Sequence, residues 1–157
     1  MRKRSSYRPG PIAAWLPKSD RMTIEIMSHV MVDKLVSGLF DDLDSNTIAY
    51  ELNITRRLAV IGNHEPIKQA ADECMGAFIG IRTRQIKTGK WGANGEEFQT
   101  LRKHLGDLSD YFARQPVHRI ESARQWVLRI NRKMQEAGAL SADIGDDMKL
   151  ENIVRAA

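Results

Sequence analysis

The feature that most constrains the fold is a helical spacing of apolar residues in five separate segments. In each segment they recur at steps of three and four residues, the period that places side chains on one face of an α-helix. The segment at 98–112 shows this spacing with Phe98, Leu101, Leu105, Leu108 and Phe112. No segment alternates apolar and polar residues for long enough to predict a sheet. The sequence therefore predicts an all-α fold.

Glycine, proline and capping residues separate these segments. Asp41 is a predicted N-cap, and Asn94 with Glu97 three residues later is typical of a capping box. The five predicted helices lie between Asp20 and Gly38, between about Leu43 and Ile61, from Pro66 to the stretch Lys87–Gly92, between Asn94 and Pro116, and between Pro116 and Gly138. Narrow apolar stripes suit helices packed at shallow angles, so we expect a single-domain bundle of about five helices.

The chain divides into an arm, a bundle and a tail. Residues 1–19 contain three prolines and a glycine and lack a helical period, which predicts an extended basic arm. Trp15 and Leu16 are expected to hold the end of this arm to the body. Residues 20–138 form the predicted bundle. Residues 139–157 form an acidic tail, in which MKLENIVRA is compatible with one further short helix.

Charge and cysteine content suggest the partners and the compartment. Of the net charge of +4, residues 1–18 carry +5 and residues 138–157 carry −2, so the body is close to neutral. The basic arm can contact phosphates or an acidic protein surface without selecting a sequence. Cys74 is the single cysteine, which suits a reducing compartment, and no apolar run approaches the roughly 18 residues of a membrane span. We therefore expect a protein of the cytoplasm that has no membrane partner.

The stretch NTIAYELNITRR, residues 46–57, matches the first half of a helix-turn-helix motif. Ala49 is the small residue where two helices would touch, and Asn53 tolerates the positive φ of the turn. The second half fails, because Ala59 and Gly62 stand where a recognition helix needs large apolar residues. A helix that continues through Asn53 costs roughly a few tenths of a kcal/mol in propensity. We therefore predict an uninterrupted helix and keep a degenerate helix-turn-helix as the alternative.

Basic residues in the arm and near the end of the third helix are the candidate contacts. The stretch IRTRQIKTGKW combines cations with an aromatic ring, which could grip a nucleic-acid backbone or an acidic partner. Cations at a helix C-terminus are also favoured by the helix dipole, so a purely structural role stays open. The partner-binding candidates are Arg2, Lys3, Arg4, Tyr7, Arg8, Arg82, Arg84, Lys87, Lys90 and Trp91, and the nucleic-acid alternative adds Arg56 and Arg57.

No residue pattern predicts a reaction. The four histidines fall on different predicted elements without the spacing of metal ligands, so neither a metal nor a cofactor is expected. Cys74 lies on the apolar stripe of the third helix and is expected in the core. Asp41, Asp42 and Asp44 are better explained by N-capping than by a metal site. We therefore predict that the chain is not an enzyme, with an enzyme of unrecognised type as the remaining alternative.

Four segments between Tyr7 and Val127 read YRPGP, LVSGLFDDLDSNTIAYELNITRRLAVIG, RTRQIKTGKWGANGEEFQTLRKHL and DLSDYFARQPVHRIESARQWV. Together they resemble small helical proteins encoded in prophages and related mobile elements of proteobacteria. The shared layout is an N-terminal YRP, a small helix, a G-x-G-like break and a T-G-x-W/F turn. Here the break reads Gly62-Asn63-His64, and residues after Gly138 fall outside the resemblance. The group has no assigned activity, so the resemblance implies a phage setting and no functional residues.

These observations lead to two expectations. The first is a non-enzymatic phage or prophage accessory protein that binds a host or phage macromolecule, for example an inhibitor of a host defence system. The second is a DNA- or RNA-binding regulator that uses the arm and residues 46–57. A protein partner is expected in the first case and nucleic acid in the second. Self-association stays open, because the apolar seams of the fourth and fifth helices can pack between chains as well as within one.

Overall fold

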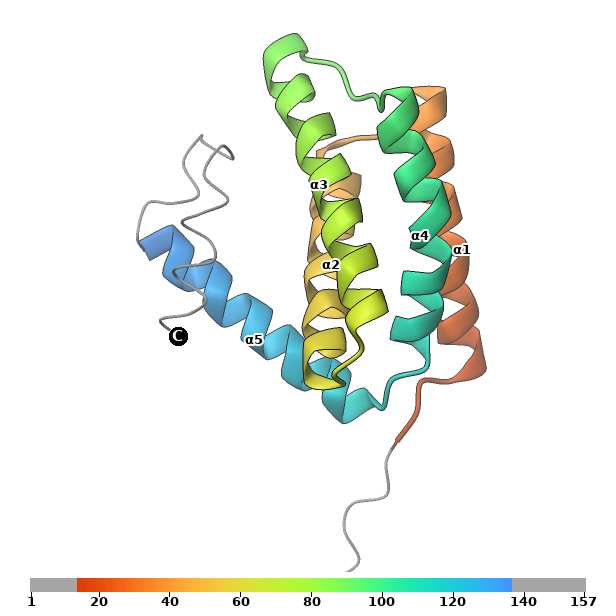
Figure 1. Ribbon diagram of the computed structural model, residues 1–157, viewed down its shortest axis with the longest axis vertical. Coiled ribbons are helices and arrows are strands. Elements are labelled where there is room, and N and C mark those ends of the chain that lie inside the picture. Colours follow the sequence, from red (N-terminus) through yellow and green to blue (C-terminus); the bar gives the residue numbers. More distant parts are fainter. Residues whose placement is uncertain (1–13, 137–157) are drawn as a thin grey trace, which may run out of the picture.

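The computed structural model describes residues 14–136, which form five α-helices (Figure 1). The helices are α1 (Lys18–Ser37), α2 (Asp42–Ile61), α3 (Glu65–Thr88), α4 (Gly95–Ala113) and α5 (Val117–Glu136). In this part of the chain no strand occurs, and an isolated bridge joins Trp15 to Pro116. The predicted all-α bundle of five helices is confirmed. Most of the predicted arm and all of the predicted tail lie outside the described residues.

The helix ends lie where the capping residues predicted them. Asp41 and Asp44 form a reciprocal capping box at the start of α2, and Asn94 and Glu97 form one at the start of α4. Gly38 and Gly89 end α1 and α3 in the left-handed conformation, with φ of 72° and 71°, which glycine adopts without steric cost. The largest difference is that α1 begins at Lys18 rather than Asp20.

Helices α1 to α4 form a four-helix bundle, and α5 packs on its side. Helix α4 packs against α1 and α3, while α2 packs against α3 and α5. In Figure 1, α5 starts at the lower end of the bundle and runs away from it at an angle. The fifth helix therefore contributes its seam to a separate contact with α2 rather than to the centre of the bundle.

Two hydrophobic clusters follow from this arrangement. The main core lies among α1 to α4 and includes Leu52, Cys74 and Leu101, all exposed by 3% or less. The second joins Ile54 and Leu58 of α2 to Ala123 and Val127 of α5. The expected burial of Cys74 is confirmed. The sequence left the seams of α4 and α5 available for self-association, but Leu101, Leu105 and Leu108 of α4 and Ala123 and Val127 of α5 are packed within one chain through these clusters.

The segment before α1 meets the body through its backbone. The Val117 N–H donates to the Ala14 carbonyl at 2.8 Å, next to the bridge between Trp15 and Pro116. The Trp15 side chain is 60% exposed, whereas Leu16 is half-buried. Trp15 therefore meets the body through its peptide groups, and its side chain lies largely in solvent.

Candidate functional site

Helix α2 is continuous through the segment that resembles a helix-turn-helix. The Asn53 side-chain amide donates to the Ala49 carbonyl at 2.8 Å, a bond to the preceding turn of the same helix. Positive φ occurs instead at Asn63, with φ of 51°, in the connection between α2 and α3. Ile48, Leu52 and Ala59 are all buried, as a continuous helix predicts. The uninterrupted helix is confirmed, so α2 offers no separate helix that could enter a DNA groove.

Arg56 and Arg57 are engaged by neighbouring helices. The Arg56 guanidinium pairs with the Asp72 carboxylate of α3. The Arg57 guanidinium carbon lies 4.5 Å from the centroid of the Trp126 ring of α5, in a cation–π contact. Its Nε–H is buried and donates to no partner among the described residues. A phosphate would have to replace these contacts, so the use of either arginine on nucleic acid stays a prediction.

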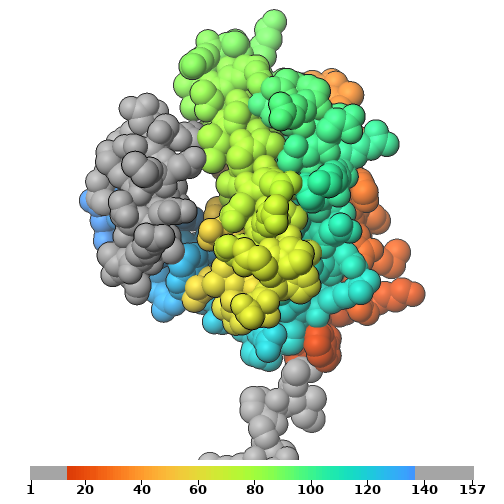
Figure 2. All heavy atoms as spheres, viewed as in Figure 1, coloured from red at the N-terminus to blue at the C-terminus, as the bar shows by residue number. Residues whose placement is uncertain are grey.

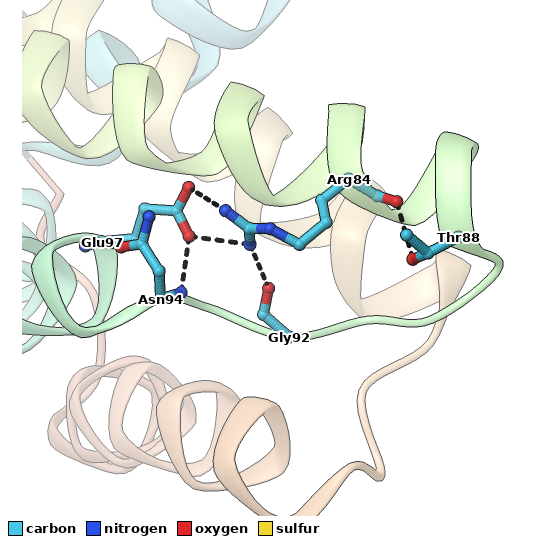
Figure 3. Close-up of polar contacts among 5 residues, drawn as sticks. All are labelled: Arg84, Thr88, Gly92, Asn94 and Glu97. Carbon is cyan, nitrogen blue, oxygen red and sulfur yellow. Dashed lines mark hydrogen bonds and ion pairs between the residues drawn. The ribbon is translucent and has the colours of Figure 1, made fainter.

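Arg84 forms a clamp between α3 and the start of α4 (Figure 3). Its Nη2 donates to Glu97 Oε1 at 2.8 Å, and its Nη1 donates to Glu97 Oε2 at 3.0 Å and to the Gly92 carbonyl at 2.7 Å. Glu97 Oε2 also accepts the Asn94 N–H at 2.7 Å, which is half of the capping box. One carboxylate therefore caps α4 and ties the connection between α3 and α4 back to α3.

The environment of Glu97 favours its charged form. Burial raises the pKa of the Glu97 carboxyl, but the hydrogen bonds from Arg84 and from the Asn94 backbone outweigh this effect and set the pKa below its ordinary value. Gly80 makes room for the carboxylate, since a Cβ built there would lie 2.5 Å from Glu97 Oε1. Gly80 was not among the residues predicted from the sequence. A glycine inside a predicted helix was the available signal.

Trp91 and Arg82 close the same end of the bundle. The Trp91 ring packs edge-on against Phe40, with centroids 5.2 Å apart, and belongs to the boundary of the main core. The Arg82 guanidinium carbon lies 5.6 Å from the Trp91 centroid, and its Nη1 donates to Ser45 Oγ of α2 at 3.1 Å. Arg82, Arg84 and Trp91 therefore hold the end of the bundle together.

Exposed aliphatic residues surround this closed end. Leu39 precedes Phe40 in the sequence, and Leu43 is the second residue of α2. Ile86 lies one turn after Arg82 on α3. Val36 lies in the last turn of α1. Their exposed fractions are 68% for Val36, 71% for Leu39, 73% for Leu43 and 58% for Ile86. The residues around the connection between α3 and α4 form the upper tip of the molecule in Figure 2.

Lys87 and Lys90 complete the surface at this end. Both are exposed, and neither takes part in an ion pair with another described residue. We call this set the bundle-end surface: Val36, Leu39, Leu43, Ile86, Lys87 and Lys90. Of the predicted contacts in the body, these two lysines face solvent, whereas Arg82, Arg84 and Trp91 serve packing. The predicted arm contacts Arg2, Lys3, Arg4, Tyr7 and Arg8 lie outside the described residues.

The aliphatic part of this surface was not predicted from the sequence. The stretch Leu39-Phe40-Asp41-Asp42-Leu43 places three large apolar residues in the turn after α1 and the first turn of α2. Only Phe40 enters the core, at 4% exposure. The available signal was a stretch too short to bury all of its apolar residues, which a helical period of apolar positions does not detect.

The reactive side chains of the body have structural roles. Burial, with a further contribution from the charge of Glu73, raises the pKa of the Cys74 thiol to about 12. Asp44 pairs with Lys34 at 2.7 Å and takes part in the capping box with Asp41, as the capping interpretation predicted. Within residues 14–136 no group of three His, Cys, Asp or Glu side chains is placed to hold a metal ion. No helix in that range has the length and apolar character of a membrane span.

A scan against protein-family models and searches of curated proteins and of solved structures found no match. The resemblance to helical proteins of prophages therefore stays a prediction from the sequence.

Proposed function

We propose that this chain is a non-enzymatic accessory protein of a phage or prophage, which binds a host or phage protein in the bacterial cytoplasm. Inhibition of a host defence system is one role of this kind. The proposed contact is the bundle-end surface. The observation that carries the proposal is the exposure of four large aliphatic side chains, by 58% to 73%, at one end of the bundle.

Scattered exposed aliphatic residues are normal on protein surfaces, but a group at one end of a molecule favours an interaction site. Burying one such side chain stabilises a complex by about 1.5–3 kcal/mol relative to leaving it in water. Leu39 and Leu43 are the most exposed of the four and are the natural anchors. Together they supply part of the affinity of a complex, to which the rest of the bundle-end surface adds.

The backbone under this surface is held in place before any partner arrives. The Arg84–Glu97 clamp fixes the connection between α3 and α4, and the contact of Trp91 with Phe40 fixes it against the turn between α1 and α2. Less conformational freedom is then lost when a partner binds. This gives the clamp a function although its residues need not touch the partner.

The two lysines indicate the chemistry of the partner. Lys87 and Lys90 lie beside the aliphatic group without an ion pair among the described residues. A protein surface with apolar residues edged by Asp or Glu would complement them. Such charges at the rim act mainly on the rate of association and on the choice of partner, whereas the aliphatic anchors set the lifetime of the complex.

The test captures proteins from a nuclease-treated bacterial lysate on the immobilised full-length chain. We expect the wild type to retain a specific protein and the double variant Leu39→Ser/Leu43→Ser to lose it. The matched control is Val60→Ser/Leu128→Ser, which removes two aliphatic side chains, exposed by 42% and 41%, outside the bundle-end surface. Lys87→Glu/Lys90→Glu should slow association at low salt.

The same experiment distinguishes the alternative. Retention of no protein, or equal retention by Leu39→Ser/Leu43→Ser, would refute the proposed surface. Retention that disappears with nuclease would support the DNA- or RNA-binding regulator instead. That regulator predicts a steep decrease of log affinity with log salt, and a smaller slope when Arg2, Arg4 and Arg8 become alanine.

A further inference from the structure

Helix α1 carries apolar residues on two opposite faces. Met31, Val32 and Leu35 enter the main core. Met22, Ile26 and Val30 recur at four-residue steps on the other side of the helix and are 50%, 56% and 37% exposed. We call these three residues the outer stripe. A surface helix ordinarily presents polar residues on this side, so the outer stripe needs an explanation.

The outer stripe faces away from the rest of the bundle. Helix α1 packs chiefly against α4 and lies at the edge of the bundle (Figure 1). The three side chains belong to neither hydrophobic cluster. None of its three residues belongs to the bundle-end surface, so the stripe carries an inference independent of the proposed function.

Charged residues at the two ends of the stripe have opposite signs. Lys18 lies one turn before Met22, and Asp33 lies about one turn after Val30. Both side chains are exposed, and neither takes part in an ion pair with a described residue. Ile26 stands midway between Met22 and Val30. A two-fold axis through Ile26 would therefore place Met22 over Val30 of a second copy and Lys18 near Asp33 at both ends.

We propose that a second copy of this chain covers the outer stripe, with the two α1 helices antiparallel. In a parallel pair Lys18 would face Lys18 and Asp33 would face Asp33, so the charges select the antiparallel arrangement. A basic partner surface would be repelled by Lys18 and an acidic one by Asp33, whereas a second copy satisfies both ends. The charges at the ends of the stripe are therefore complementary to those of a second, antiparallel copy.

The size of the stripe sets the strength of the dimer. From Met22 to Val30 it covers about 12 Å of helix, at about 1.5 Å per residue. An interface built on one pair of helices at this length buries less than the roughly 1,200 Å² of a standard specific contact, so the dimer is weak. The dimer therefore forms reversibly and dissociates on dilution.

Sedimentation velocity of the full-length chain over a range of concentrations tests the dimer. We expect a concentration-dependent monomer–dimer equilibrium for the wild type. Ile26→Glu places a carboxylate from each copy at the centre of the contact and should raise the dissociation constant by at least about a hundredfold. The control Leu128→Glu changes an aliphatic residue of α5 with 41% exposure and should leave the equilibrium unchanged.

A charge exchange tests the antiparallel arrangement separately. Asp33→Lys alone would bring two positive charges together at each end and should weaken the dimer at low salt. Lys18→Asp/Asp33→Lys exchanges both charges and should restore the wild-type equilibrium. A wild-type monomer at all concentrations, a dimer that tolerates Ile26→Glu, or a double exchange that restores nothing would each overturn the proposal. Leu39→Ser/Leu43→Ser should keep the dimer. Failure of the proposed function at the bundle-end surface can therefore be distinguished from failure of the dimer.

Discussion

Replacing Gly80 by alanine tests whether the clamp fixes the end of the bundle. Gly80 lies inside α3, where a Cβ would stand 2.5 Å from Glu97 Oε1. The Glu97 side chain can move, but only by giving up its bonds to Arg84 and to the Asn94 N–H. Gly76 lies one turn earlier in the same helix, and a Cβ there would meet nothing within 4 Å. Gly76→Ala is therefore a matched control.

Two effects of opposite sign decide the result. Alanine is favoured over glycine inside a helix by about 1 kcal/mol, and this gain applies equally at Gly76 and Gly80. At Gly80 the displaced Glu97 side chain weakens the capping box of α4, which costs about 1 kcal/mol. Overpacking costs a further 1–3 kcal/mol or so. We expect Gly80→Ala to unfold about 2 kcal/mol more easily than the wild type and Gly76→Ala to be about 1 kcal/mol more stable.

Thermal and urea unfolding followed by circular dichroism at 222 nm would measure both changes. For a chain of this size about 2 kcal/mol corresponds to a midpoint roughly 6–8 °C lower. If the two alanine variants are equally stable, Glu97 leaves its position at no cost, and the clamp does not hold the connection between α3 and α4. In that case the clamp does not preorganise the bundle-end surface for binding.

Two further predictions concern buried titratable groups. Burial raises the pKa of Glu51, so the charged carboxylate opposes folding and stability decreases as the pH rises through its ordinary value toward the raised one. Glu51→Gln should therefore stabilise the chain by the order of 1 kcal/mol at pH 7 and have little effect at pH 3, in urea unfolding at both values. Equal effects at both values would contradict a pKa raised in the folded chain. Cys74 is fully buried with a thiol pKa of about 12, so a thiol reagent at pH 8 should label it only as fast as the chain unfolds. Rapid labelling of the native chain would contradict its place in the core.

The helix boundaries could be predicted because short-range chemistry determines them. Asp41 and Asn94 each bond to backbone within three residues, and Gly89 ends α3 through its own conformation. Such signals need no knowledge of distant parts of the chain. The angle of α5 could not be predicted in the same way. Its seam specifies which face is buried, but Ile54 and Leu58 on a second face of α2 determine where that face docks.

The role of the basic residues failed to follow from the sequence for a related reason. Arg82 and Arg84 are two residues apart, so they leave α3 in different directions, one toward Ser45 and the other toward Glu97. Glu97 already had a complete explanation as a capping residue, and its second role appears only when α3 and α4 lie side by side. A cluster of cations in sequence can thus be distributed among separate structural contacts.

Few basic side chains of the predicted site in the body remain available for binding. Once neighbouring helices engage Arg56, Arg57, Arg82 and Arg84, the two lysines of the bundle-end surface remain the exposed cations of the predicted body site. Two point charges beside four aliphatic side chains favour a protein over a phosphate backbone, because a backbone gains nothing from apolar contact and would need more charges to bind at physiological salt. The nucleic-acid alternative therefore depends on the arm. Removing residues 1–13 should abolish any duplex binding while leaving protein capture by Leu39 and Leu43 intact.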